Sequence, residues 1–140
     1  MVVRSFQLSD YISVTELFKN VLTESCYDDT MEAFARQLSW DSELVLVALE
    51  NEQIAGVIIG TIDNHNAYYY RIAVGEQFQR RGIGKALIEA MRQRFLQRKV
   101  KRIMVTVDVH NEMVLPVYES AGYQAADFSR SAHRLSIVNG

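Results

Sequence analysis

The sequence predicts an α/β (α+β) domain built on a mixed, mostly antiparallel central sheet of about seven strands, with about four helices. Three β-rich runs, LVLVALE, IAGVIIGTI and AYYYRIAV, follow one another at hairpin spacing and indicate an antiparallel meander. A helical pattern then extends from Gly82 to about Arg98, and the alternating run RIMVTVDV follows it. A helix between two strands makes a crossover, so the fourth and fifth strands are expected to be parallel neighbours.

The segment before this region is expected to add one strand and two helices. Residues 2–6 are typical of a short strand, and the SD pair after them is suited to cap an amphipathic helix. The apolar positions of that helix repeat at helical spacing: Val14, Leu17, Phe18, Val21 and Leu22. The polar run ESCYDDT interrupts the pattern, so we expect an exposed break there. A second, shorter helix is expected to start within residues 28–30.

The segment after the fifth strand is expected to add a helix and two strands. Asn111 is suited to cap a helix that runs through Tyr118 and ends near Gly122, a residue that favours the left-handed position after a helix. Pro116 means either that one helical hydrogen bond is missing or that the helix starts a few residues late. The runs at 123–128 and 133–138 are expected to complete the sheet as a hairpin.

Length and composition indicate one soluble globular domain over residues 1–140. Apolar residues make up 49% and charged residues 23%, and the chain has one proline. A single cysteine, Cys26, excludes an internal disulfide, and no Cys/His spacing resembles a metal site, which favours a reducing, cytoplasmic location. No secretion signal or membrane span is seen, so no membrane partner is expected. An acidic pI near 5.9 argues against a nucleic-acid partner.

The turn QRRGIG at residues 79–84 predicts an anion site. It lies between a strand and a helix, where unpaired backbone N–H groups and the helix dipole attract phosphate. The side chains of Arg80, Arg81 and Lys85 would add positive charge. Alternatively, the two glycines simply allow the helix to pack closely on the sheet. A P-loop is excluded because Ala86 follows Lys85, and a dinucleotide fingerprint is incomplete because Leu87 replaces its third glycine.

The same turn resembles the Q/R-x-x-G-x-G/A signature of the GNAT superfamily of acyl-CoA-dependent N-acetyltransferases. The longer stretch YRIAVGEQFQRRGIGKALIEAM is similar to that family's strand, pyrophosphate loop and helix. A second stretch, VTVDVHNEMVLPVYESAGY, resembles its next strand and following segment. The resemblance covers nearly the whole chain, most clearly residues 68–123. It implies the GNAT fold, in which the parallel fourth and fifth strands splay apart.

The resemblance also implies acetyl-CoA (coenzyme A) as cofactor and assigns residues to it. The pantetheine arm would lie along the backbone of Ile72, Ala73 and Val74. The pyrophosphate would bind backbone N–H groups of Gln79, Arg80, Arg81, Gly82, Ile83 and Gly84, with Lys85 next in line. Asn111 would hydrogen-bond the pantetheine, cap the following helix, or do both. Tyr118 matches the family's general acid, although a tyrosine there also suits simple packing.

The implied reaction is direct attack of a primary amine on the thioester, with a small-molecule or protein amine as acceptor. Some family members carry a basic glutamate on the fourth strand, but AYYYRIAVG has no carboxylate. The open candidates for the base are Glu24, Asp108, His110 and a water chain gated by Tyr68 or Tyr70. Asp108 is equally suited to pair with an arginine, and His110 to cap a helix. Cys26 as a nucleophile would need a neighbouring base that the sequence does not identify.

Several alternatives stay open at this point. The chain is either an active N-acetyltransferase, a catalytically silent acyl-CoA-binding module of the same fold, or a dinucleotide-binding protein. The acidic residues Glu24, Asp28 and Asp29 favour a cationic amine, but they do not rank polyamines, amino sugars, amino acids and protein N-termini. The length of the acyl group and the formation of a homodimer are likewise open.

Overall fold

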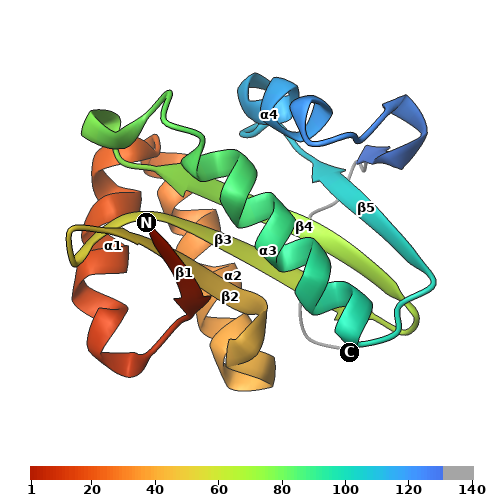
Figure 1. Cartoon of the computed structure of the whole chain (residues 1–140), viewed down its shortest axis with the longest axis horizontal. Coiled ribbons are helices and arrows are strands. Elements are labelled where there is room, and N and C mark those ends of the chain that lie inside the picture. The colour runs from red at the N-terminus through yellow and green to blue at the C-terminus, as the bar shows by residue number, and fades with distance from the viewer. Residues whose placement is uncertain (131–140) are drawn as a thin grey trace.

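A six-stranded sheet forms the centre of the described part of the chain, residues 1–130 of a computed structural model. Its strands are β1 (Val2–Ser5), β2 (Val45–Glu50), β3 (Gln53–Asp63), β4 (Asn66–Val74), β5 (Arg102–Val107) and β6 (Phe128–Arg130). The helices are α1 (Tyr11–Val21), α2 (Glu24–Asp41), α3 (Ile83–Gln97) and α4 (Leu115–Ser120). The strands follow chain order across the sheet. Neighbours from β1 to β4 are antiparallel, and β4–β5 is parallel, which confirms the predicted mixed sheet (Figure 1).

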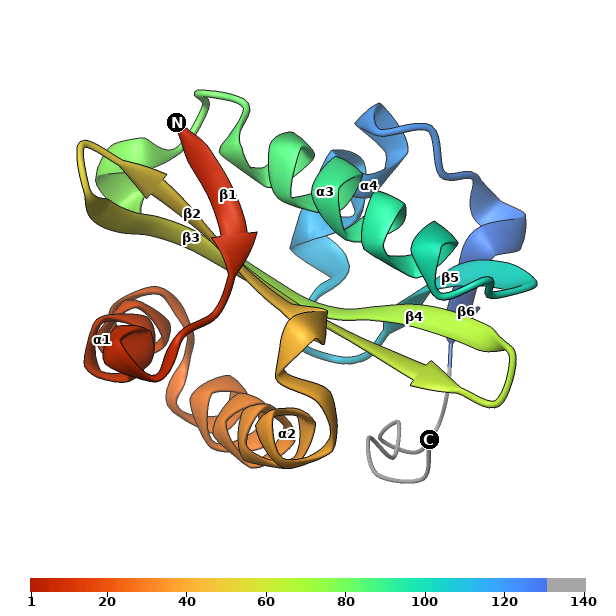
Figure 2. The same cartoon turned by 60° about the horizontal axis from the view of Figure 1, so that its bottom comes forward.

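Helices cover both faces of this sheet (Figure 2): α3 and α4 lie on one face, and α1 and α2 on the other. Strand β2 shows why its sequence is continuously apolar. Leu46 and Ala48 pack in the cluster under α3, whereas Val45 and Val47 pack in the cluster under α1 and α2. Because successive side chains of a strand point to opposite faces, a strand covered on both sides needs apolar residues at every position.

Strands β4 and β5 are paired over only part of their length. The ladder runs from the pair Asn66 and Arg102 to the pair Tyr69 and Val105 and then stops. Both strands continue beyond that point, and Figure 1 shows them diverging toward their carboxyl ends. The predicted splay of the parallel pair is therefore confirmed.

The splay leaves part of the β4 backbone without a strand partner on one side. The Gly75 N–H donates to the Ala55 carbonyl (2.8 Å), so Gly75 faces β3. Main-chain groups alternate in direction along a strand, so those of Ala73 also face β3. Those of Ile72 and Val74 face the other way, toward the opening between β4 and β5.

A β-bulge interrupts β4 at Tyr70. Arg71 lies opposite Ile59 and Tyr69 lies opposite Gly60, so Tyr70 has no partner residue in β3. The bulge brings the side chains of Tyr70 and Arg71 to the same face, where the guanidinium lies 4.7 Å from the phenol ring centroid. In a regular strand the two side chains would point to opposite faces.

Helix α2 starts earlier than the sequence analysis expects. It begins at Glu24, with Thr23 as its N-cap, and the Thr23 hydroxyl accepts a hydrogen bond from the Cys26 N–H (3.3 Å). The expected exposed break over ESCYDDT is therefore wrong, because this threonine caps the helix before the acidic residues begin. As a result, Asp28 and Asp29 lie in the first two turns of α2.

The chain after β5 confirms one expectation and corrects two. Helix α4 starts late, at Leu115, so Pro116 lies in its first turn, where no N–H partner is needed. Asn111 precedes a short 3-10 turn but makes no side-chain cap, which corrects its expected capping role. The strand expected at 123–128 is wrong for most of its length, because Ala125–Asp127 form a 3-10 turn and β6 starts at Phe128.

This 3-10 turn has a local cause: the Gln124 N–H donates to the Asp127 carboxylate (2.8 Å). The short β6 that follows pairs parallel to β5. The expected strand at 133–138, and the hairpin it would complete, lie outside the described residues.

Candidate active site

The turn between β4 and α3 exposes backbone N–H groups. The first helical hydrogen bond of α3 joins the Ala86 N–H to the Gly82 carbonyl (3.0 Å). The N–H groups of Ile83, Gly84 and Lys85 therefore have no acceptor within the helix. Gly82 has a positive φ of 79°, and a Cβ there would meet nothing within 4 Å, so backbone conformation is the reason for this glycine. The turn presents the positive end of the helix dipole to solvent.

Gly84 is glycine for a different reason. A Cβ at this position would lie 3.1 Å from a methyl group of Val117 on α4. The missing side chain lets the first turn of α3 approach α4 closely. One glycine of the pair therefore opens the turn, and the other allows close helix packing.

The predicted pyrophosphate residues surround this turn. The side chains of Gln79, Arg80, Arg81 and Lys85 are all exposed there, whereas that of Ile83 is buried in the core. The Gln79 amide donates to the Val74 carbonyl (3.1 Å) and ties the turn to the end of β4. The turn thus combines free N–H groups with three exposed cationic side chains.

Asn111 holds the end of β5 in shape. Its side chain is buried, its amide group donates to the Thr106 carbonyl (2.5 Å), and its oxygen accepts from the Asp108 N–H (2.9 Å). These bonds fix the loop after β5 at the edge of the opening between the strands.

Tyr118 is fully buried between α4 and the sheet. Its ring centroid lies 5.3 Å from that of Tyr69, and its side chain is only 1% exposed. Burial raises the pKa of Tyr118 above its ordinary value, and the Arg71 cation partly opposes this rise. The phenol is therefore protonated at neutral pH.

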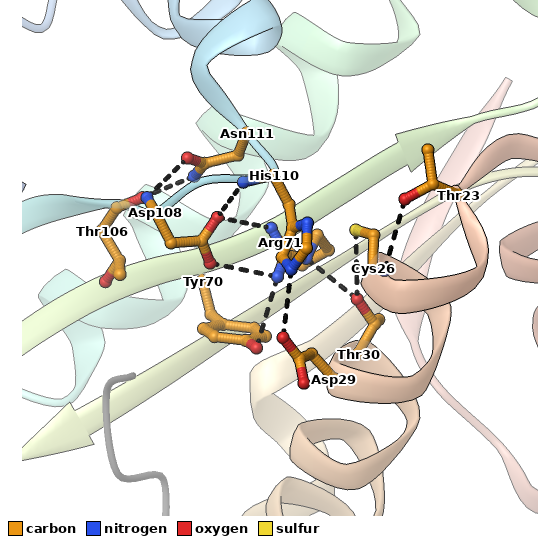
Figure 3. A network of polar contacts seen from close by, with 10 residues as sticks. All are labelled: Thr23, Cys26, Asp29, Thr30, Tyr70, Arg71, Thr106, Asp108, His110 and Asn111. Carbon is orange, nitrogen blue, oxygen red and sulfur yellow. Dashed lines mark hydrogen bonds and ion pairs between the residues drawn. The ribbon is translucent and has the colours of Figure 1, made fainter. Parts of the chain in front are cut away.

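Arg71 is a buried cation at the point where β4 and β5 separate. Its Nη1 and Nη2 donate to the two Asp108 carboxylate oxygens (3.3 and 3.1 Å), and its Nε donates to the Thr30 hydroxyl (2.9 Å). Nη2 also donates to the Tyr70 hydroxyl (3.3 Å). Burial alone lowers the pKa of Arg71, but Tyr70 and Asp108 outweigh it and leave the pKa above its ordinary value. The guanidinium joins α2, β4 and the loop after β5 (Figure 3).

His110 extends this network toward the surface. Its Nε2 lies 3.0 Å from a carboxylate oxygen of Asp29 on α2, and its backbone N–H donates to Asp108 (2.8 Å). The side chain of His110 is 14% exposed and that of Asp29 31%. Figure 3 shows Asp29 and Thr30 on α2 approaching Arg71, Asp108 and His110 from the opposite side. We call these five residues with Tyr70 the Arg71 cluster.

Comparison with protein families gives a match over most of the chain. The model of the Acetyltransferase (GNAT) family matches residues 11–123. The chain belongs to the GNAT acetyltransferase family. This is a family of transferases that use acetyl-CoA.

Solved structures share the GNAT fold with this chain. One belongs to the NatC complex bound to Gag peptide and CoA: 22% identity, TM-score 0.69, with 90% of this chain and 91% of that chain covered. The ribosomal-protein-S18-alanine N-acetyltransferase from Escherichia coli matches at 20% identity and TM-score 0.68, covering 88% and 77%. An aminoglycoside 6'-N-acetyltransferase from Acinetobacter haemolyticus matches at 14% identity and TM-score 0.72, covering 97% of both chains. At these identities the likeness shows the fold alone.

The other residues considered for catalysis in this GNAT protein, as base or in the case of Cys26 as nucleophile, lie in different surroundings. Glu24 is exposed at the start of α2, and Tyr68 is half-buried on β4. Cys26 is buried, with its sulfur 3.8 Å from the Thr30 hydroxyl, which is not a base. Asp108 pairs with an arginine, as one of the two sequence interpretations expects.

The sequence analysis missed Arg71 and Thr30. A charged residue inside the apolar run AYYYRIAV is a usable signal, because a buried arginine requires an anionic partner. The partner itself is 37 positions away, so only the fold brings the two together.

Two further properties of this GNAT chain concern the described residues. Among residues 1–130, no group of His, Cys, Asp and Glu side chains could hold a metal ion, and no helix is long and apolar enough to cross a membrane.

A cavity of about 750 Å³ opens between α1 and the β4–α3 turn, lined by residues that include Asp10, Glu16, Glu52 and Glu76. Neither Tyr118 nor the Arg71 cluster lines this cavity.

Replacing Arg71 with Gln is expected to lower the free energy of unfolding by about 3 kcal/mol. The change leaves the Asp108 carboxylate and the Thr30 hydroxyl without their charged partner. Chemical denaturation measures the loss. The matched control is Arg36→Gln on α2, where an exposed ion pair with Glu32 is removed at a cost of about 0–1 kcal/mol. Equal losses in the two variants would contradict the structural role of Arg71.

Proposed function

We propose that the chain, as a single domain over residues 1–140, transfers an acetyl group from acetyl-CoA to a primary amine of a small molecule or a protein. The observation that carries the proposal is the opening between β4 and β5, which ends at the turn with free N–H groups. An extended ligand with an anionic group at one end fits both features. Acetyl-CoA has a pantetheine arm and a pyrophosphate, and the family uses it.

The residues around the opening fit this ligand. The main-chain groups of Ile72 and the N–H of Val74 would bind the pantetheine, with Ala73 between them, while the Val74 carbonyl stays bonded to the Gln79 side chain. The pyrophosphate would accept hydrogen bonds from the N–H groups of Arg80, Arg81, Gly82, Ile83 and Gly84, beside Lys85. The Gln79 N–H would join them in exchange for its bond to the Glu76 carbonyl (3.4 Å). Asn111 would direct its second amide hydrogen to the pantetheine while its other bonds hold the loop.

Tyr118 would act as the general acid of the transfer. Acetyl-CoA supplies the thioester when bound. The acceptor nitrogen bonds to the carbonyl carbon as the carbon–sulfur bond breaks, and Tyr118 donates its proton to the departing sulfur. Moving a proton from an ordinary phenol to a thiolate costs roughly 2 kcal/mol. Burial increases that cost, and the nearby Arg71 cation reduces it.

The acceptor would approach from the face covered by α1 and α2. That face carries Asp29 and the exposed Asp28 and Glu24 on α2, and these carboxylates attract a cationic amine. The similar structures include a complex bound to a peptide and acetyltransferases named for a ribosomal-protein alanine and an aminoglycoside antibiotic, all of which offer amines. The proposal therefore includes both protein and small-molecule acceptors.

A second candidate is an acyl-CoA-binding module of the same fold without turnover. The observation that favours it is Arg71, because β4 carries a buried cation and no carboxylate that could act as base. Both candidates bind the cofactor alike, so only turnover separates them.

Acetyl-CoA and CoA are expected to stabilise the protein against thermal unfolding, whereas NAD at the same concentration is not. A ligand at about 100 times its dissociation constant adds roughly 2.7 kcal/mol to the free energy of unfolding. Thiol release is then followed with acetyl-CoA and three acceptors: an alanine-starting peptide, an aminoglycoside and a polyamine. Stabilisation without thiol release would favour the silent module, and stabilisation by NAD alone would overturn the proposal.

Replacing Tyr118 with Phe is expected to reduce kcat about 100-fold without changing stabilisation by acetyl-CoA. The change removes the donated proton and keeps the buried ring. Tyr123→Phe is the matched control, because Tyr123 also lies against Tyr69 and its hydroxyl contacts that of Tyr69 (2.6 Å). Steady-state kinetics on both variants decide the matter. If Tyr118→Phe turns over as fast as the control, Tyr118 is not the acid.

A further inference from the structure

We infer that His110, held by Asp29, takes the proton from the acceptor amine. The inference rests on the proposed function, since it names the base for that same reaction. An amine that is cationic in water must lose a proton before it attacks a thioester, and β4 offers no carboxylate for this purpose.

The Arg71 cluster lies beside the reaction site. The last β4–β5 pair is Tyr69 with Val105, and Arg71 is the second β4 residue after it. Arg71 therefore borders the opening. The same guanidinium is near enough to Tyr118 to oppose part of the rise that burial causes in the pKa of that phenol. Tyr118 borders the opening from the sheet face covered by α3 and α4, and the Arg71 cluster borders it from the face covered by α1 and α2. The proposed acceptor approaches from this second face.

Asp108 is poorly suited to accept the proton. Its two carboxylate oxygens accept hydrogen bonds from Arg71, and one of them also accepts from the His110 N–H. Protonation would break a buried ion pair. Glu24 is exposed at the start of α2, and the hydrogen bonds of the Arg71 cluster do not include it.

His110 combines the properties that a base needs. The Asp29 carboxylate accepts a hydrogen bond from Nε2, so the proton of a neutral ring is expected on Nε2. Among residues 1–130 the structure shows no hydrogen-bond partner for Nδ1, which leaves that nitrogen available to accept a proton. Asp29 would also stabilise the ring when it becomes charged. The other titratable groups of the Arg71 cluster are Asp108, which accepts from the His110 backbone N–H, and Arg71 and Tyr70 on β4.

The proton balance closes with these two residues. Nδ1 of His110 takes one proton from the ammonium form of the acceptor and later releases it to water. The neutral nitrogen then bonds to the thioester carbon, and the carbon–sulfur bond breaks. Tyr118 protonates the sulfur and recovers a proton from the newly acylated nitrogen. The products are an N-acetyl amine, the CoA thiol and one released proton.

The test is the pH profile of kcat/KM for His110→Gln, using whichever of the three acceptors is turned over. Glutamine can still donate to Asp29 but cannot act as a base. We expect kcat/KM at pH 7 to fall about 100-fold. The profile of the unaltered protein should rise less steeply with pH than that of the variant, because a base in the site takes the proton from the bound amine. The variant should instead rise about tenfold per pH unit up to the pKa of the acceptor.

His65→Gln is the matched control, because His65 lies exposed in the β3–β4 turn. Its profile should match that of the unaltered protein. A readout independent of activity is the ¹⁵N NMR spectrum of the imidazoles, assigned by loss of the His110 signals in His110→Gln. We expect His110 in its Nε2–H form at pH 7.5, and that preference should weaken in Asp29→Asn.

The outcomes separate the two proposals. Unchanged kcat/KM and an unchanged profile in His110→Gln overturn this inference while leaving the acetyltransferase proposal intact. An Nδ1–H form of His110 also overturns it. A lower kcat/KM with an unchanged profile shape would make His110 only a structural contact between α2 and the loop, which contradicts the inference. If the unaltered protein turns over none of the amines, both the proposed function and this inference fail.

Discussion

Buried backbone groups need hydrogen-bond partners, and the separation of β4 from β5 beyond Tyr69 and Val105 removes them from one side of β4. The main-chain groups of Ile72 and the N–H of Val74 face this opening, whereas the Val74 carbonyl accepts a hydrogen bond from the Gln79 side chain. A ligand that runs along the strand would supply the missing partners and would arrive at the N–H groups at the start of α3. The site is therefore a consequence of an incomplete sheet more than of any single side chain.

The opening between β4 and β5 has to be kept from closing, and the side chains around it hold the two strands apart. Arg71 donates across it to Asp108 and to Thr30 on α2, and Asn111 fixes the turn that follows β5. Replacing a buried ion pair with apolar residues is often neutral or stabilising. The value of Arg71 and Asp108 therefore lies in the spacing they impose, because a fully apolar contact here would not orient α2 and the loop as specifically. The bulge at Tyr70 brings Arg71 to the right face.

The strongest sequence signals were those set by local physics. The glycine turn before α3 and the late start of α4 at Pro116 follow from contacts within a few residues, and the continuous apolar run of β2 by itself indicates a strand. The GNAT fold was likewise predictable from the two stretches around residues 68–123. The predicted element boundaries that were wrong depend on single capping hydrogen bonds: that of Thr23 at the start of α2, and that between Gln124 and Asp127 before β6.

The parts of the site that the sequence could not predict depend on pairings between distant segments. Arg71 meets Thr30 from 41 positions away, and His110 meets Asp29 from 81 positions away. No periodicity encodes such pairings, and the bulge that redirects Arg71 has no clear signal in AYYYRIAV. From the sequence, Asp108 and His110 are only two of several candidates for the base. In the fold, the Asp108 carboxylate is paired with Arg71, whereas Nδ1 of His110 has no hydrogen-bond partner among the described residues.

The measurement that tests the central claim most directly is backbone amide hydrogen exchange, residue by residue, with and without CoA. The account predicts slower exchange in the presence of CoA at Ile72 and Val74 and at residues 83–85, with no change along α1. Protection of residues lining the cavity between α1 and the β4–α3 turn, without protection of Ile72 and Val74, would contradict binding between β4 and β5.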